Sequence, residues 1–138
     1  MKTTEKIIIK NELSQLEIVM NKINTISKNC EINDKDRYSL LLVMEELLVN
    51  IISYGFEEKE ESNIEIQIDK LSSWVEIVIT DKGKEFNLLA KEEKSTDDFD
   101  GKTVGGWGIH LVKKSVDSLE YKRFEDKNII KIIKSLNY

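Results

Sequence analysis

The stretch LLVMEELLVNIISY, residues Leu41–Tyr54, decides the fold that we expect for this chain. Its apolar residues fall on nearly every side of a helix, which predicts that most of the helix is buried. Asn33 precedes it as a candidate N-cap, and Asp34 and Asp36 follow where the helix dipole favours negative charge. Gly55 supplies the stop. We therefore predict a mostly buried helix from about Asn33 to Tyr54.

Glu46 and Asn50 are the polar residues of this helix that need an explanation. Their i, i+4 spacing places them on one face, and Glu46 cannot be buried cheaply without a partner. One interpretation is an exposed polar stripe, because with Glu45 next to Glu46 at least one acid must face water. The other is a pair of side chains that project together into a functional site.

The segments on either side of this helix complete the fold. Glu12–Lys28 has the apolar spacing of an amphipathic helix, with an apolar face of Leu13, Leu16, Met20, Ile23 and Ile26. Ile109–Val116 has helical spacing as well, and a hairpin turn is expected near Leu71–Ser73. Further runs are rich in β-branched residues or alternate between apolar and polar, as strands do: Lys6–Lys10, Ile64–Asp69, Val75–Thr80, Leu119–Phe124 and Ile129–Ile133. The first of these is a plausible edge strand. This order predicts an α/β two-layer sandwich, with a mixed, mostly antiparallel sheet covered on one face by helices.

The composition is typical of one soluble, globular domain over residues 1–138. Hydrophobic residues make up 40% of the chain and charged residues 34%. The apolar run in Met1–Glu12 is too short for a signal peptide, and no later run approaches the roughly 20 residues that span a bilayer. We therefore expect a cytoplasmic protein that does not enter a membrane.

Charge and cysteine content exclude several other classes of function. Cys30 is the only cysteine, so an intrachain disulfide is excluded and a thiolate zinc site is not expected. The net charge of −5 argues against a nucleic-acid partner, since phosphate neutralisation needs clustered Lys and Arg. A mildly acidic surface would suit a basic protein partner, although such charge also keeps a small domain soluble.

Asp81-Lys82-Gly83 follows directly after the strand that ends at Thr80. An ordinary turn has the same composition. Alternatively, a carboxylate here could accept a hydrogen bond from an exocyclic amino group, while Gly83 lets the backbone approach a ring. These demands suit adenine.

Gly105-Gly106-Trp107-Gly108 leads into the helix predicted at Ile109. Free N–H groups and the positive end of the helix dipole would face a bound anion there, and phosphate is the natural candidate. The alternative is a flexible hinge. A Walker-type P-loop is excluded, because neither Gly-Lys-Ser nor Gly-Lys-Thr occurs in the chain. The polar stretch between Asp81 and Val104 is too long for an ordinary connection and is expected to form a lid.

Taken together, these motifs resemble a known family. LLVMEELLVNIISY, ITDKGKEFN (Ile79–Asn87) and GGWGIHLVKKSVDSLEYKR (Gly105–Arg123) occur in the order found in the ATP-binding domain of gyrase, heat-shock protein 90, histidine kinases and MutL proteins. This is the GHKL group, which has the Bergerat ATP-binding fold. The resemblance covers about Leu40–Leu136, and its closest branch is the small stand-alone anti-sigma-factor serine kinases of bacteria.

The resemblance implies ATP and magnesium as cofactors. In this family the asparagine that matches Asn50 holds magnesium, and the glutamate that matches Glu46 is the catalytic base. Asp81 matches the adenine-binding aspartate. The other cofactor-binding positions that we infer are Gly83, Lys102, Gly105, Gly106, Trp107 and Gly108.

The lid is expected at about residues 91–104. Lys102 would offer a cation to the γ-phosphate or pair with an acid of the lid, such as Asp98 or Asp100. Trp107 would form a wall on the lid side or anchor the following helix. His110, the only histidine, is expected to be a partly exposed packing residue.

Val104 is the departure from the family pattern that bears most on function. Well-studied kinases of the family present an arginine towards the γ-phosphate at or near this place. Two hypotheses follow. In the first, the protein is an anti-sigma factor that uses Mg-ATP to phosphorylate a serine or threonine of an anti-anti-sigma-type partner. In the second, it is a nucleotide-gated protein-binding module with little or no kinase activity.

Partners follow from the same resemblance. The expected partners are an anti-anti-sigma-type protein, a sigma factor and a second copy of the chain. The homodimer would form through the sheet face or through the edge at Lys6–Lys10. A chain that keeps the fold but has lost its nucleotide is a third reading.

Overall fold

The computed structural model describes residues 2–90 and 104–137, and for residues 104–107 it describes the backbone alone. The strands are β1 (Thr3–Lys10), β2 (Asn63–Lys70), β3 (Trp74–Asp81), β4 (Ser118–Phe124) and β5 (Lys127–Ser135). The helices are the short 3-10 turn η1 (Leu13–Gln15), α1 (Leu16–Asn29), α2 (Asp34–Tyr54), the 3-10 turn η2 (Leu88–Ala90) and α3 (Val104–Ser115).

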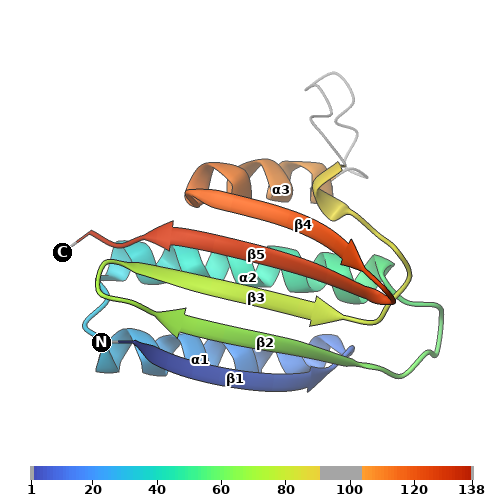
Figure 1. Ribbon diagram of the computed structural model, residues 1–138, viewed down its shortest axis with the longest axis horizontal. Coiled ribbons are helices and arrows are strands. Elements are labelled where there is room, and N and C mark those ends of the chain that lie inside the picture. The colour runs from blue at the N-terminus through green and yellow to red at the C-terminus, as the bar shows by residue number, and fades with distance from the viewer. Residues whose placement is uncertain (1, 91–103, 138) are drawn as a thin grey trace.

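The strands form one sheet in the order β1-β2-β3-β5-β4, and the helices lie on one of its faces (Figure 1). This confirms the two-layer α/β sandwich. All four neighbouring pairs of described strands are antiparallel, which sharpens the expectation of a mixed, mostly antiparallel sheet. β1 lies at one edge, as predicted, and β4 lies at the other.

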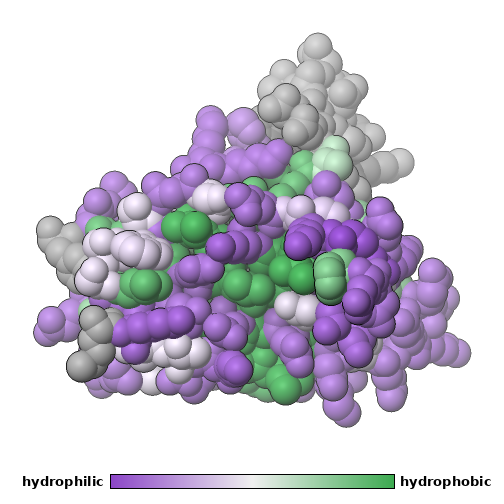
Figure 2. Space-filling model, viewed as in Figure 1, coloured by the Kyte–Doolittle hydropathy of each residue, from purple (hydrophilic) through white to green (hydrophobic). Residues whose placement is uncertain are grey.

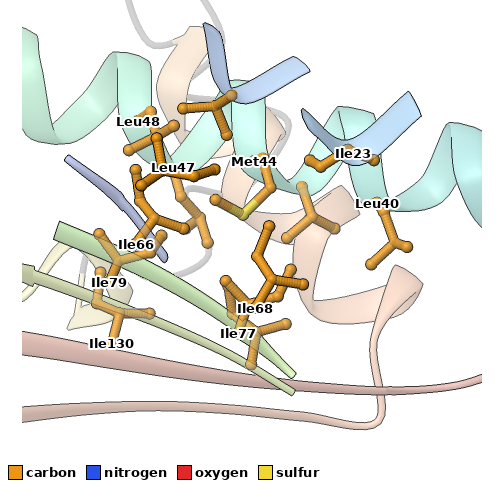
Figure 3. Close-up of a cluster of buried hydrophobic side chains, with 14 of the residues drawn as sticks. Ile23, Leu40, Met44, Leu47, Leu48, Ile66, Ile68, Ile77, Ile79 and Ile130 are labelled. Atoms are coloured by element: carbon orange, nitrogen blue, oxygen red, sulfur yellow. The ribbon is translucent and has the colours of Figure 1, made fainter. Parts of the chain in front are cut away.

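The core is the layer of side chains between α2 and the sheet. Figure 3 shows Met44, Leu47 and Leu48 of α2 directed towards isoleucines of β2, β3 and β5. All three of these α2 side chains are fully buried. Burying one such side chain contributes about 1.5–3 kcal/mol, so this layer dominates the stabilisation of the fold.

The ends of α2 are fixed as the sequence predicts. The Asn33 side chain accepts a hydrogen bond from the N–H of Asp36 at 2.8 Å, and Gly55 is the C-cap. Asp36 does more than favour the helix dipole, because it is buried and its carboxylate accepts the N–H of Asn137 at 2.8 Å. Lys134 lies 3.7 Å from the same carboxylate. The start of α2 is therefore tied to the C-terminal end of the chain.

The predicted elements are all present, with shifted boundaries. The helix expected from Glu12 begins at Leu16, because Leu13–Gln15 form a separate 3-10 turn. Leu13, assigned to the apolar face of that helix, is 53% exposed, so this assignment is wrong. The turn at Leu71–Ser73 is confirmed, with the Leu71 N–H bonded to the Trp74 carbonyl.

The other face of the sheet is not covered by described helices (Figure 1). Figure 2 shows this face, on which hydrophobic side chains lie among hydrophilic ones. Ile8 is 62% exposed, and Trp74 and Phe124 are also exposed. This is the surface on which the expected sheet-face homodimer would form, and that dimer stays a prediction. Among the described residues, no helix is long and apolar enough to cross a membrane.

The hydroxyl of Ser27 gives a prediction about stability. It is buried beside a small, partly open pocket lined by apolar residues such as Leu40 and Ile77, and it has no hydrogen-bond partner among the described residues. We expect Ser27→Ala to raise the free energy of unfolding by about 1 kcal/mol, because an unsatisfied buried polar group costs about 1–3 kcal/mol. Urea unfolding would measure this. Ser115→Ala is the control, since the exposed Ser115 hydroxyl already donates to the Leu111 carbonyl. Equal effects of the two changes would contradict the prediction.

Candidate functional site

Glu46 and Asn50 form a bonded pair on α2. Asn50 is 5% exposed, and its side-chain nitrogen donates to the Glu46 backbone carbonyl at 2.8 Å and to Glu46 Oε2 at 3.0 Å. Glu46 is half-buried, whereas its neighbour Glu45 is exposed. The exposed polar stripe is therefore wrong for Asn50, and Glu45 is the acid that faces water. Because both donors of the amide are used, Oδ1 is the atom of Asn50 left to contact a ligand.

The first turn of α3 lies next to this pair. The helix begins at Val104, so the glycines predicted to precede it belong to its N-terminal turns. Gly108 is buried against the Glu46 carboxylate, and a Cβ at residue 108 would overlap both carboxylate oxygens. Gly108 thus lets α3 approach Glu46. The N–H groups of a first helical turn have no acceptor within their own helix, so an anion could bind them there.

The turn after β3 contacts the end of α2 through its backbone. The Lys84 N–H donates to the Gly55 carbonyl at 2.9 Å. Any side chain at residue 83 would overlap that carbonyl oxygen and crowd the Asp81 carboxylate, so glycine is required at this position for steric reasons. Asp81-Lys82-Gly83 is therefore more than an ordinary turn. It fastens the sheet to the helix that holds Glu46 and Asn50.

Asp81 is the last residue of β3 and is buried, on the helix-covered face. Its Oδ1 accepts the Gly83 N–H at 2.8 Å and the Asn128 side-chain N–H at 3.0 Å. Burial raises the pKa of Asp81, although these two hydrogen bonds and the charge of Arg123 oppose the rise. No described residue donates to Oδ2, which leaves that oxygen as an acceptor for a ligand amino group.

Asn128 is a residue of this site that the sequence interpretation missed. It lies opposite Asp81 in the β3–β5 register and is 3% exposed. Besides Asp81, its side-chain nitrogen donates to the Lys84 carbonyl at 2.8 Å. Its Oδ1 accepts from the Tyr121 hydroxyl at 2.5 Å and from Arg123 Nη1 at 3.2 Å.

A signal for Asn128 was present in the sequence. Asn128 shares strand parity with Ile130 and Ile132, so it faces the core, where an asparagine needs hydrogen-bond partners. Tyr121 and Arg123 share the parity of Leu119 in the same way. Parity identifies such polar residues as inward-facing, but it does not show which side chains they meet.

Several predicted site residues lie outside what the structure describes. Lys102 and residues 91–103 of the expected lid are outside the described residues, and only the backbone is described for Val104, Gly105, Gly106 and Trp107. The backbone of the latter four is helical. His110 is exposed, and Cys30 is a partly buried free thiol.

A family model for the histidine kinase-like ATPase domain matches residues 9–134. The chain belongs to the histidine kinase-like ATPase domain family. The match runs from the end of β1 to the end of β5, so it includes every part of the site described above. Membership of this ATPase family implies that the chain binds ATP. The GHKL resemblance of the sequence motifs is thereby confirmed.

Solved structures of the same fold include proteins of two kinds. The RsbU and RsbW domains of Rv1364c from Mycobacterium tuberculosis give a TM-score of 0.67 at 10% identity, covering 97% of this chain and 32% of that chain. The chain thus spans about a third of that protein. The histidine kinase domain of a blue-light activated histidine kinase from Erythrobacter litoralis EL346 gives 0.56 at 16% identity, covering 90% and 60%.

A further structure, the mycobacterial sensor histidine kinase MprB, gives a TM-score of 0.54 at 13% identity, covering 97% of this chain and 98% of that chain. Among curated proteins, none matches the sequence. At these identities the structural likeness shows the fold.

The raised pKa of Asp81 predicts a pH dependence of stability in this ATPase domain. When the folded pKa lies above the unfolded one, the folded state binds more protons between them, so stability falls as pH rises through that window. Asp81→Asn removes this loss while keeping the Oδ1 acceptor. We expect the melting temperature of Asp81→Asn relative to the unchanged protein to be higher near pH 7 than near pH 4. A difference that is independent of pH would contradict the argument.

The contact between Gly108 and Glu46 predicts energetic coupling. Gly108→Ala would displace the Glu46 carboxylate from Asn50, whereas in a Glu46→Ala background the added methyl group has room and Ala gains roughly 1 kcal/mol of helix propensity over Gly. We expect Gly108→Ala to be more favourable in the Glu46→Ala background by about 1–2 kcal/mol. Denaturant unfolding of the four proteins of this cycle measures the coupling. Additive effects would show that the contact does not form in solution.

Proposed function

We propose that this chain is an ATP-binding regulatory protein that acts like an anti-sigma factor, transferring phosphate from Mg-ATP to a serine or threonine of an anti-anti-sigma-type partner. The observation that carries the proposal is the convergence of Glu46, Asn50, Asp81 and Gly108 at one end of the sandwich. Backbone contacts between the end of α2 and the turn after β3 hold them there. Membership of the ATPase family supplies the nucleotide.

The adenine end of the site is assigned to Asp81. The ionised carboxylate is an acceptor only, and its free Oδ2 matches the amino group of adenine. Gly83 keeps the backbone of the turn close to Gly55, so the floor beneath the base is formed by main chain and not by a side chain. The structure therefore supports recognition of the base by one buried acceptor.

The phosphate end is assigned to Asn50 and to the first turn of α3. No group of three or more acidic, histidine or cysteine side chains in residues 2–90 and 104–137 is arranged to hold a metal. Magnesium fits such a site, since it keeps waters and takes other ligands from phosphates, so that one protein oxygen, Asn50 Oδ1, is sufficient. When bound with ATP, magnesium would neutralise negative charge on the phosphates.

Glu46 is assigned the role of general base. The hydroxyl oxygen of the partner's serine or threonine bonds to the γ-phosphorus, and the bond from that phosphorus to the bridging oxygen breaks, so that ADP leaves. The hydroxyl proton passes to the Glu46 carboxylate. Oε2 already accepts from Asn50, so Oε1 is the oxygen available for the proton.

The second candidate function is a nucleotide-gated binding module. Val104, in place of the arginine of well-studied family members, favours it. Without that arginine, stabilisation of the negative charge in the transition state would depend on magnesium, backbone N–H groups and Lys102. In this reading, ATP changes the affinity for a protein partner and no phosphoprotein forms. The RsbW domain among the structural neighbours supports a protein partner for either function.

Calorimetry with magnesium-ATP, followed by transfer of radiolabelled γ-phosphate to a candidate partner, tests both functions. We expect Asn50→Ala and Asp81→Asn to lower ATP affinity at least about tenfold, since each removes a hydrogen bond or ligand to a charged group. Glu46→Gln should bind ATP nearly normally and abolish transfer. Glu45→Gln is the matched control, because Glu45 is the exposed neighbour on the same helix.

Each outcome separates the hypotheses. Transfer that survives Glu46→Gln removes Glu46 as the base. Nucleotide-dependent partner binding without a phosphoprotein supports the gated module. Absence of any ATP binding by the unchanged chain would refute the proposal and leave a fold that has lost its nucleotide.

A further inference from the structure

Next to Asp81 the sheet carries a partly buried hydrogen-bond cluster that the proposed reaction does not use directly. It consists of Asn128 on β5 and of Tyr121 and Arg123 on the edge strand β4. We infer that these three residues are positioning residues for the nucleotide's adenine ring. They fix the orientation of the Asp81 carboxylate and thereby make the site select adenine over guanine. This inference rests on the proposed ATP site.

The orientation of the Asn128 amide is set by its partners. Its nitrogen faces two acceptors, Asp81 Oδ1 at 3.0 Å and the Lys84 carbonyl at 2.8 Å. Its oxygen faces the Tyr121 hydroxyl at 2.5 Å and Arg123 Nη1 at 3.2 Å. Tyrosine could donate or accept, but a guanidinium has no acceptor. A flipped amide would therefore place its NH2 against the Arg123 donor and its oxygen against the Lys84 carbonyl and the Asp81 carboxylate, so these groups together fix the orientation.

The fixed amide determines which oxygen of Asp81 is free. With Asn128 donating to Oδ1 and the Gly83 N–H donating to the same atom at 2.8 Å, Oδ1 is fully engaged. Oδ2 has no donor among the described residues and is the oxygen presented to a ligand. Arg123 reinforces the geometry, since Nη1 also donates to the Gly83 carbonyl at 2.9 Å.

The same cluster favours the ionised form of the Asp81 carboxylate and so opposes the effect of burial on its pKa. Burial raises the pKa of Asp81, while the Asn128 hydrogen bond and the charge of Arg123 lower it. The charged groups that act on Asp81 and Tyr121 are Arg123, which acts on both, and Glu85, which acts on Tyr121. An ionised Oδ2 accepts from the amino group of adenine, whereas the corresponding carbonyl of guanine would face it acceptor to acceptor. A protonated carboxyl would lose this discrimination.

The test compares the ratio of ATP affinity to GTP affinity, measured with magnesium by calorimetry, for the unchanged chain and for Asn128→Leu, Tyr121→Phe and Arg123→Met. We expect Asn128→Leu to lower the ratio about tenfold or more, because it removes a hydrogen bond to a charged group. Arg123→Met should lower it less, and it carries the test if Asn128→Leu does not fold. Asp36→Asn is the control, since Asp36 is equally buried but lies at the other end of α2.

A second readout is the pKa of Asp81 in the unliganded protein, measured from the NMR chemical shift of its carboxyl carbon as pH is varied. Asn128→Leu should raise this pKa, so that ATP affinity is lost at a higher pH on acidification than in the unchanged chain. A merely structural role would lower affinity for both nucleotides alike and leave the ratio and the pKa unmoved, which would overturn the inference. If the unchanged chain binds neither nucleotide, the proposed function fails, whereas normal ATP binding with an unchanged ratio in the variants refutes only the positioning role.

Discussion

The backbone contact between Gly55 and Gly83 is the constraint on which the rest of the site depends. Gly55 ends the central helix and Gly83 belongs to the turn that follows the central strand, so their contact joins the two layers at one point. The hydrogen bond from Lys84 to the Gly55 carbonyl can form only because residue 83 has no side chain to occupy that space. Asp81 is thereby placed at a fixed distance from the last turns of α2.

The opposite end of α2 is held just as firmly, by the buried Asp36 carboxylate and the backbone N–H of Asn137. A helix fixed at both ends, with isoleucines packed along its length, cannot slide or rotate without losing many contacts (Figure 3). Glu46 and Asn50 therefore have a position set by the fold and not by their own interactions. A ligand that spans from Asp81 to Asn50 meets a preformed surface, which lowers the entropy cost of binding.

The sequence was sufficient for the elements and for their order, because period-2 and period-3.6 apolar patterns, Asn33 and Gly55 are local signals. By resemblance it also predicted site residues, of which the fold brings Glu46, Asn50 and Gly108 into contact with one another. It failed at Leu13, where apolar spacing continued across a break in the helix, and it missed Asn128. Strand parity is a local pattern that shows Asn128 to face inward, but its partners on other strands are supplied by strand register, which has no local pattern. Only the fold reveals that Asn128 stands opposite Asp81.

Glu46 shows how packing and chemistry constrain one another in this domain. Its carboxylate touches Gly108 and accepts a hydrogen bond from Asn50, so it connects α2, which carries the proposed metal ligand, to α3, whose first turn is the proposed phosphate site. A carboxylate held on two sides has little freedom to adopt other rotamers, which is what the proposed role as general base near a reacting hydroxyl requires. The same rigidity means that any shift of α3, such as one caused by phosphate at its first turn, must be transmitted to Glu46 and Asn50. Catalysis and nucleotide-dependent gating would thus use one contact, which a side chain at residue 108 would disturb by displacing the Glu46 carboxylate.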